Sequence, residues 1–220
     1  MIADLYNVRP AKFGQVDNFF TAASKFGEQI QQWHGVDVTI NARLRNGLTF
    51  QGGTSTGRTL NDQCDVGPKV DSPSTRFCRV ETPFLTQAKA LGAYTIPRID
   101  LQLSATFQSK PGVQLAANYN APNAVVAPSL GRPLAGGAAN VSVNLVEPGT
   151  LCGDRLNQLD FRTAKILRFS GLRMQLAFDL YNAFNSSPVL GYNQTFGSAW
   201  LTPTSVLAAR FAKLSAQIDF

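Results

Sequence analysis

The chain has 220 residues, of which 44% are hydrophobic, so it can bury a core and disorder is not the default expectation. Only 15% of the residues are charged, against about a quarter in a typical globular protein, and polar uncharged residues, Gly and Pro take their place. The net charge is +6, but the basic residues are scattered and never form a run of four, which argues against nucleic acid as a partner.

Residues 1–32 are expected to form a loop or a partial strand, with at most a helical turn or two over 25–33. Trp33 and His34 are interpreted as an interfacial aromatic residue and a loop histidine. The first clear strand is predicted over 36–45, where apolar and polar residues alternate. Successive side chains on a strand point to opposite faces, so this pattern predicts one apolar and one polar face.

The rest of the chain is predicted to form hairpins separated by long polar stretches. Asn46-Gly47 is a strong hairpin signal, because both turn positions favour positive φ. Further strands are predicted over residues 48–53, 84–96, 99–107, 156–169, 174–180 and 211–220. Short turns near 46–47, 97–98 and 170–171 therefore alternate with long stretches over about 58–83, about 109–156 and the region before 211.

This alternation of short and long connections is typical of transmembrane β-barrels, which have short periplasmic turns and long extracellular loops. Strands of about 9 to 13 residues also suit a tilted membrane span better than the globular average of about 5 to 6. No stretch approaches the roughly 18 apolar residues of a membrane helix. We therefore predict an all-β fold over 33–220: an antiparallel transmembrane β-barrel segment, about seven to eight strands of a larger barrel, with long extracellular loops.

The alternation also predicts what each face contacts. The residues expected to face lipid are Val38, Ile40, Leu101, Leu103, Leu176, Phe178, Leu214 and Ile218. The residues expected to face the lumen are Asp37, Arg43, Asp100, Asp160, Arg162 and Asp179. Cross-strand charge pairing would offset their burial, so we interpret these lumen residues as barrel wall rather than as solute contacts.

Binding residues concentrate on loops that a rigid scaffold holds in place. The aromatic candidates for solute contact are Tyr119, Tyr192, Phe196 and Trp200. Cys64 and Cys78 lie in one long loop, so a disulfide is predicted there for an exported protein, with two free thiols as the alternative. Cys152 is the odd cysteine, free or paired outside this segment.

Phosphate binding, zinc binding and catalysis have little support in the sequence. Gly52–Thr59 nearly spells a phosphate loop, but Arg58 stands where Lys is required and no helix signal follows. A single His and the absence of a CxxC pair give no zinc pattern. No Ser/His/Asp set appears, so neither an enzyme nor a cofactor is predicted.

Several short motifs, in order, resemble a known family. They are Tyr94–Arg98, Gln114–Asn118, Leu156–Arg162, Asp179–Asn185 and Trp200–Ser205, followed by a last strand that ends on Phe220. From about Phe13 to Phe220 the chain resembles the C-terminal end of TonB-dependent receptors, and within them the group with an N-terminal carboxypeptidase-regulatory-like domain.

The resemblance implies a piece of a 22-stranded barrel of the bacterial outer membrane, which holds a plug and imports a large or scarce solute. Nothing here resembles the plug, so the chain is expected to be the C-terminal third of such a receptor. The implied partners are outer-membrane lipid, the barrel-assembly machinery, an unidentified solute, and an inner-membrane energy-coupling complex reached through the missing N-terminal parts. Phe220 would be the terminal signal that the assembly machinery recognises.

Two other architectures remain open from the sequence. A soluble, secreted β-sandwich binding module would bury the apolar strand faces against a second sheet. A small closed outer-membrane pore would need an eighth strand from residues 1–32.

Overall fold

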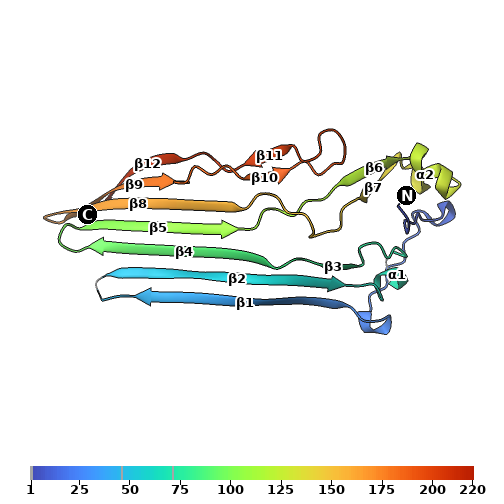
Figure 1. Ribbon diagram of the computed structural model, residues 1–220, viewed down its shortest axis with the longest axis horizontal. Helices are drawn as coiled ribbons and strands as arrows, with labels where there is room; N and C mark the ends of the chain where they lie inside the picture. Colours follow the sequence, from blue (N-terminus) through green and yellow to red (C-terminus); the bar gives the residue numbers. More distant parts are fainter. Residues whose placement is uncertain (1, 46, 71) are drawn as a thin grey trace.

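The computed structural model describes residues 2–45, 47–70 and 72–220, and it is mostly antiparallel β. Seven long strands form one open sheet in chain order, so each long strand pairs with the next long strand along the sequence (Figure 1). They are β1 (Ile30–Arg43), β2 (Leu48–Asp62), β4 (Leu85–Ile96), β5 (Leu101–Lys110), β8 (Leu156–Phe169), β9 (Leu172–Tyr181) and β12 (Phe211–Asp219). The short strand β3 (Arg79–Glu81) adds to the end of β2. The predicted all-β antiparallel class and the seven strands are confirmed.

Several strand ends differ from the prediction. β1 begins at Ile30, so Trp33 and His34 lie within a strand, and the prediction of a loop histidine is wrong. The helical turn near them is reduced to η2 (Ala23–Lys25). β2 continues to Asp62, well past Gly53, because its polar half pairs with β1 along its whole length. β5 begins at Leu101, since Pro97–Asp100 form the turn and Asp100 adopts a φ of 48°.

The long connections have secondary structure of their own, and all of them lie at the end of the sheet opposite the short turns (Figure 1). The first carries α1 (Gly67–Val70), and the N-terminal segment carries η1 (Pro10–Lys12) and η2. In the second, β6 (Asn118–Pro122) and β7 (Asn140–Asn144) pair around α2 (Asn123–Leu130) and η3 (Ala135–Gly137). In the third, β10 (Val189–Tyr192) pairs with β11 (Pro203–Val206). Among the described residues, no helix has the length and apolar character needed to cross a bilayer.

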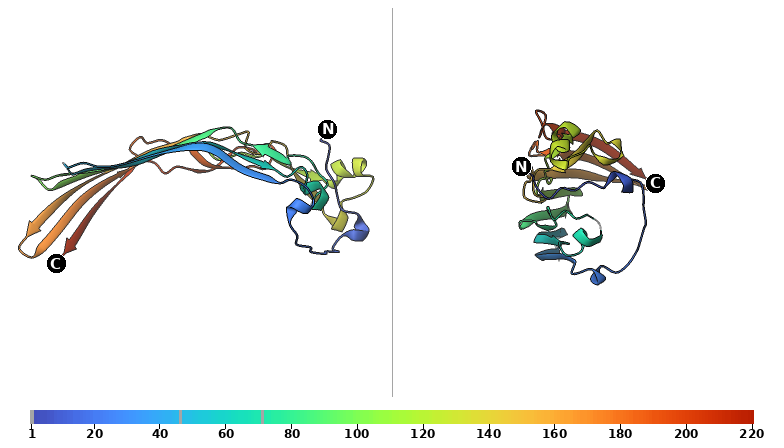
Figure 2. Two further views of the ribbon diagram at one scale, coloured as in Figure 1. Left: turned by 90° about the horizontal axis from the view of Figure 1, so that it is seen from below. Right: turned by 90° about the vertical axis from the view of Figure 1, so that its right-hand side faces the viewer.

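The hydrophobic core lies mostly in these connections rather than on the sheet. The buried apolar side chains of the connections are Val66, Leu115, Ala117, Ala121, Leu134, Ala135 and Val143. On the long strands they are Ala164, Ile166 and Ala177. The sheet itself is a single curved layer, and Figure 2 shows no second layer stacked on it. The connections therefore fold against one another, while most of the sheet stays uncovered.

Hydrogen bonds tie the N-terminal segment and the first two connections into one unit. Arg132 donates from Nη1 to the Asn7 side chain over 2.9 Å, and Lys69 donates to the Phe26 carbonyl over 2.5 Å. Arg76 donates from Nη2 to the Asn144 carbonyl over 2.9 Å, which joins the first connection to the second. Residues 2–29 thus lie across the tips of the two connections, beyond the end of the sheet (Figure 2).

Candidate functional site

The register of the sheet places like residues side by side. Residues paired directly across antiparallel strands point to the same face of the sheet. One row across all seven strands is apolar throughout: Ala42, Phe50, Gly92, Ala105, Phe161, Leu180 and Ala212. The next row, on the other face, is mostly polar: Arg43, Thr49, Ala93, Ser104, Arg162, Asp179 and Lys213. These two rows therefore give the sheet one mostly apolar face and one mostly polar face across its width.

The register puts all eight residues expected to contact lipid on the apolar face, and many of them are exposed. Phe178 is 37% exposed, Ile218 54% and Leu214 81%. Lys165 is a charged exception near the short-turn end, and its ammonium donates to the Ile99 carbonyl in the turn. A lysine can lay its stem along an apolar surface in this way while its charge leaves that surface.

The polar face holds five of the six charged residues expected to face the lumen. Arg162 and Asp179 pair across β8 and β9 with 3.3 Å between Nη1 and Oδ1, and Asp179 is only 4% exposed. Asp160 accepts hydrogen bonds from the Gln158 side chain and from the Asn182 backbone N–H. The polar face also holds Asp37 and Arg43, whose register partners are Ser55 and Thr49.

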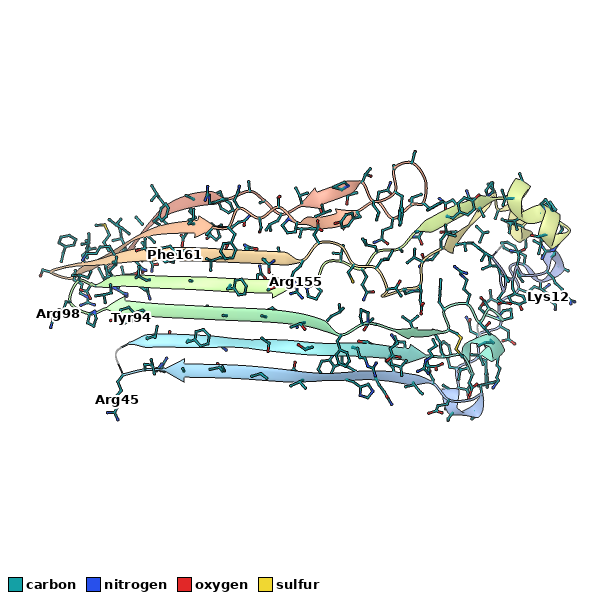
Figure 3. All side chains as sticks on the ribbon, viewed as in Figure 1. Lys12, Arg45, Tyr94, Arg98, Arg155 and Phe161 are labelled. Atoms are coloured by element: carbon teal, nitrogen blue, oxygen red, sulfur yellow. A yellow bond between two sulfur atoms is a disulfide. The ribbon has the colours of Figure 1, made fainter. Side chains whose placement is uncertain are left out.

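Asp100 is placed differently, because the turn before β5 contains it. Its carboxylate lies 3.3 Å from Nη2 of Arg168, which pairs in register with Arg173 on the adjacent strand. Asp100 therefore contributes to the charged border of the sheet near the short turns, where Figure 3 also places Arg45 and Arg98.

The polar face is hollowed into three neighbouring cavities, which together we name the trough. The widest, about 550 Å³, lies over β1, β2, β4 and β5 and includes Asp37 and Lys89. It shares Ser55 and Gln87 with a second cavity of about 230 Å³. The second shares Thr59, Thr82 and Gln114 with a third, of about 460 Å³, below the first two long connections. The trough thus runs from the middle of the sheet to the folded connections.

Trp33 forms part of the floor of the trough. A Cβ atom added to Gly35 or to Gly57 would lie 2.3 Å from the indole ring, so the ring covers both glycines. The two glycines face each other across β1 and β2, and an aromatic ring beside such a pair supplies the packing that glycine lacks. This role of Trp33 was not predicted from the sequence, although a tryptophan two positions before a strand glycine was the available signal.

Three of the four loop aromatics predicted to contact solute come together. The Tyr119 and Phe196 ring centroids are 6.3 Å apart, and those of Phe196 and Trp200 are 5.9 Å apart. Trp200 also donates from Nε1 to the Ala116 carbonyl over 3.0 Å. These contacts join the second connection to the third. Tyr192 packs elsewhere, against Gly153, where an added Cβ would lie 2.7 Å from the tyrosine ring.

A disulfide joins Cys64 and Cys78 in the first connection, with their Cα atoms 4.8 Å apart. Next to it, Asp62 accepts hydrogen bonds from the Cys64 backbone N–H and from Arg79. The hydrogen bond from Cys64 is the main cause that lowers the pKa of the Asp62 carboxyl group below its usual value. Cys152 is a free, half-buried thiol.

Neither a metal-type cluster nor a phosphate loop is present among the residues that the structure describes. Within 2–45, 47–70 and 72–220 no three His, Cys, Asp or Glu residues gather as a metal site. Gly52–Thr59 lies inside β2, so its backbone amides serve the sheet instead of a helix N-terminus that could hold phosphate.

No family model matches this chain, and no curated protein or solved structure is significantly similar to it. Its function therefore has to be inferred from the two faces of the sheet, the trough and the folded connections.

Proposed function

We propose that the chain is the C-terminal part of a TonB-dependent receptor of the bacterial outer membrane. The sheet would form part of the wall of a transmembrane β-barrel, with its apolar face in lipid and its polar face toward the lumen. The long connections would lie outside the cell and take part in binding a large solute for uptake.

The height of the apolar face supports this proposal. From Leu172 to Leu180 the alternate residues of β9 face the apolar side, and these eight steps rise about 27 Å at ~3.4 Å per residue. At a strand tilt of about 40° this span corresponds to about 20 Å along the membrane normal, which with the side chains approaches the ~25 Å apolar band of outer-membrane barrels.

The band also has defined borders. On the side of the long connections, Thr56 donates to the Thr86 hydroxyl and Ser109 to the Asn157 side chain, so hydroxyls and amides replace aliphatic groups there. Arg155 joins the same border by donating to Ser109 and to the Thr86 carbonyl. Polar groups at this level suit an interface between hydrocarbon and water.

The observation that carries the proposal is the drift of the band from strand to strand. On β1 the apolar positions run from Val36 to Leu44 with Ile40 at the centre, and the row of Ile40 crosses β5 at Phe107. On β12 they run from Ala212 to Phe220 with Ala216 at the centre.

The row of Ala216 crosses β5 at Leu101. Phe107 and Leu101 are six residues apart, so the band drifts by about one residue at each of the six steps from β1 to β12. A rise of ~3.3 Å for each ~4.8 Å between strands tilts the strands by about 35° relative to the band. Strands in membrane barrels are tilted by about 35–45° from the membrane normal. If the apolar band of this sheet lies level in a membrane, its strands therefore have the tilt that a barrel requires.

The rival architectures lack the elements that they need. A β-sandwich requires a second sheet over the apolar face, whereas the two small sheets β6–β7 and β10–β11 belong to the long connections (Figure 1). A small closed pore requires a further strand near the N-terminus, but the described residues 2–29 contain none, and β1 and β12 remain unpaired edges. Two open edges suit a piece of a larger barrel.

Matched lysine substitutions on the two faces test the proposal. Leu103→Lys puts a charge near the centre of the apolar band, and Ser104→Lys puts the same charge on the polar face of the same strand. Leu103→Lys should destabilise the chain in lipid vesicles by about 2–4 kcal/mol, and Ser104→Lys should cost much less. Urea titration of vesicle-bound chain, followed by tryptophan fluorescence, measures the difference. A chain that stays monomeric in detergent-free buffer, with equal effects of the two lysines, would refute the proposal.

A further inference from the structure

The second cavity of the trough, at Trp33, has an unusual lining. One side of the indole rests on Gly35 and Gly57, and the Trp33 residue is nevertheless 50% exposed, so part of the ring is open to the cavity. The other lining residues with polar side chains are Ser55, Thr59, Thr82, Gln87 and Gln114. Leu85, Pro111 and Gly57 complete the lining, which includes no ionisable side chain.

Several of these polar groups are available to a ligand. The Thr82 hydroxyl accepts a hydrogen bond from the Thr59 backbone N–H, which fixes its position. Within the part of the chain that the structure describes, the side chains of Ser55, Gln87 and Gln114 make no hydrogen bond to protein. Two amides and a hydroxyl therefore offer both donors and acceptors around one exposed aromatic ring.

We propose that this cavity binds a sugar ring of a neutral glycan, an inference that rests on the proposed function because it requires the polar face to line the uptake route. The negative face of an aromatic ring attracts partly positive C–H groups, and one face of a pyranose ring presents several of them. The hydroxyls at the rim of a pyranose can both donate and accept, as the amides of Gln87 and Gln114 do.

The neutral lining disfavours other classes of solute. Phosphate and carboxylate groups are recognised by Arg or Lys, and the second cavity has neither. A cationic ligand over an aromatic ring would gain from a carboxylate beside it, and none lines this cavity. A glycan can give up its bound water to amides and hydroxyls without leaving a charge unpaired.

The continuity of the trough indicates that the glycan has several sugar units. The second cavity shares lining residues with the third, toward the long connections, and with the first, toward the middle of the sheet. The first cavity has two charged lining residues that the second cavity lacks. They are Asp37, which is the register partner of Ser55, and Lys89, which lies two residues past Gln87 on β4. A chain of sugars along the trough would therefore place its uncharged rings at Trp33.

The test is calorimetric titration of the full chain, folded in detergent micelles, with neutral hexasaccharides of glucose and of N-acetylglucosamine. At least one of them should bind, and Trp33→Ala should weaken its affinity about tenfold or more, whereas Trp33→Tyr keeps a ring and should weaken it less. Gln87→Ala should also weaken binding. The matched control Gln217→Ala changes an exposed glutamine of the same face on β12, outside the trough, and should bind as the unchanged chain does.

Circular dichroism would check that each variant keeps its strands. Absence of binding by every neutral hexasaccharide would overturn the inference, and so would equal affinity of Trp33→Ala and the unchanged chain. Binding of an uncharged peptide or a ferric chelate instead, lost in Trp33→Ala, would assign the cavity to another solute class and equally overturn it. The comparison of Leu103→Lys with Ser104→Lys in vesicles does not involve glycan. If the chain inserts into vesicles as proposed but binds no glycan, only the inference about the cavity fails, and the proposed function is unaffected.

Discussion

At the scale of single residues, Asn182 holds the third connection to the sheet. It is 2% exposed and has a φ of 50°, in the left-handed region. Its Nδ2 donates to the carbonyls of Ser186 and Ala208 over 2.8 Å each, and its Oδ1 accepts from the Ser186 N–H. One amide thus ties the start of the connection to its end, three residues before β12 begins.

Replacement of Asn182 should therefore be costly. Asn182→Ala leaves two carbonyls without their donor and places a Cβ-bearing residue without a polar side chain at positive φ, so we expect a loss of about 2–4 kcal/mol in the free energy of unfolding. Urea titration in detergent micelles measures it. Asn120→Ala, at an exposed asparagine of β6, should stay within about 0.5 kcal/mol. Equal stability of the two variants would contradict this role of Asn182.

At the scale of elements, the faces of the strands could be predicted from the sequence, but several strand ends could not. Alternation with period two specifies which residues share a face, and the register keeps Val38 and Leu214 on one face at opposite edges of the sheet. The end of β2 was missed because residues 54–56 are all Ser or Thr, which carry no apolar alternation. The extra strand length forms the wall of the trough, which depends on the pairing of Trp33 with Thr59 and on glycines that no periodicity marks.

The contacts of the loop aromatic residues were also only partly predictable from the sequence. Their residue type suggested a role, and Tyr119, Phe196 and Trp200 do meet. Tyr192 is only a few residues from Phe196 in the chain, yet the hairpin of β10 and β11 turns it toward Gly153. Which aromatic residue joins the cluster is decided by this hairpin, whose bulged register the sequence did not reveal.

The first connection gives a prediction at the scale of an element. The disulfide closes a loop of about 15 residues, for which a chain-entropy model gives roughly 3 kcal/mol. Reduction, or Cys64→Ser with Cys78→Ser, should speed tryptic cleavage at Lys69 and Arg76. Peptide mapping by mass spectrometry follows these sites. Cys152→Ser should cleave like the unchanged chain, and equal cleavage rates with and without the disulfide would argue against its role in holding the connection.

At the scale of the whole molecule, the sheet exposes both edges and the full apolar face, while its connections are compact. A soluble domain does the reverse, burying its sheet and leaving its loops exposed. Figures 1 and 2 show the helices and small strands of the connections gathered at one end of the uncovered sheet.

The end of the chain offers a test at the same scale. Phe220 directly follows β12, continues its apolar alternation in the sequence and is fully exposed. If the chain belongs to an outer-membrane receptor, as proposed, and the assembly machinery recognises Phe220, then Phe220→Asp in the full-length protein should reduce the amount of heat-modifiable barrel in outer membranes. Asp219→Asn, one residue earlier on the polar face, should assemble normally. If Phe220→Asp assembles as well as the unchanged protein, Phe220 is not the residue that the assembly machinery recognises.

The drift of the apolar band by about one residue per strand has a consequence for the width of the proposed barrel. Strands ~4.8 Å apart and tilted by about 35° each occupy about 6 Å of circumference. The seven strands would then supply about 41 Å of the rim, and 22 strands would enclose a circle about 41 Å across. An opening that wide would let small metabolites leak freely, so if the sheet belongs to such a barrel, as proposed, the barrel would need its lumen blocked.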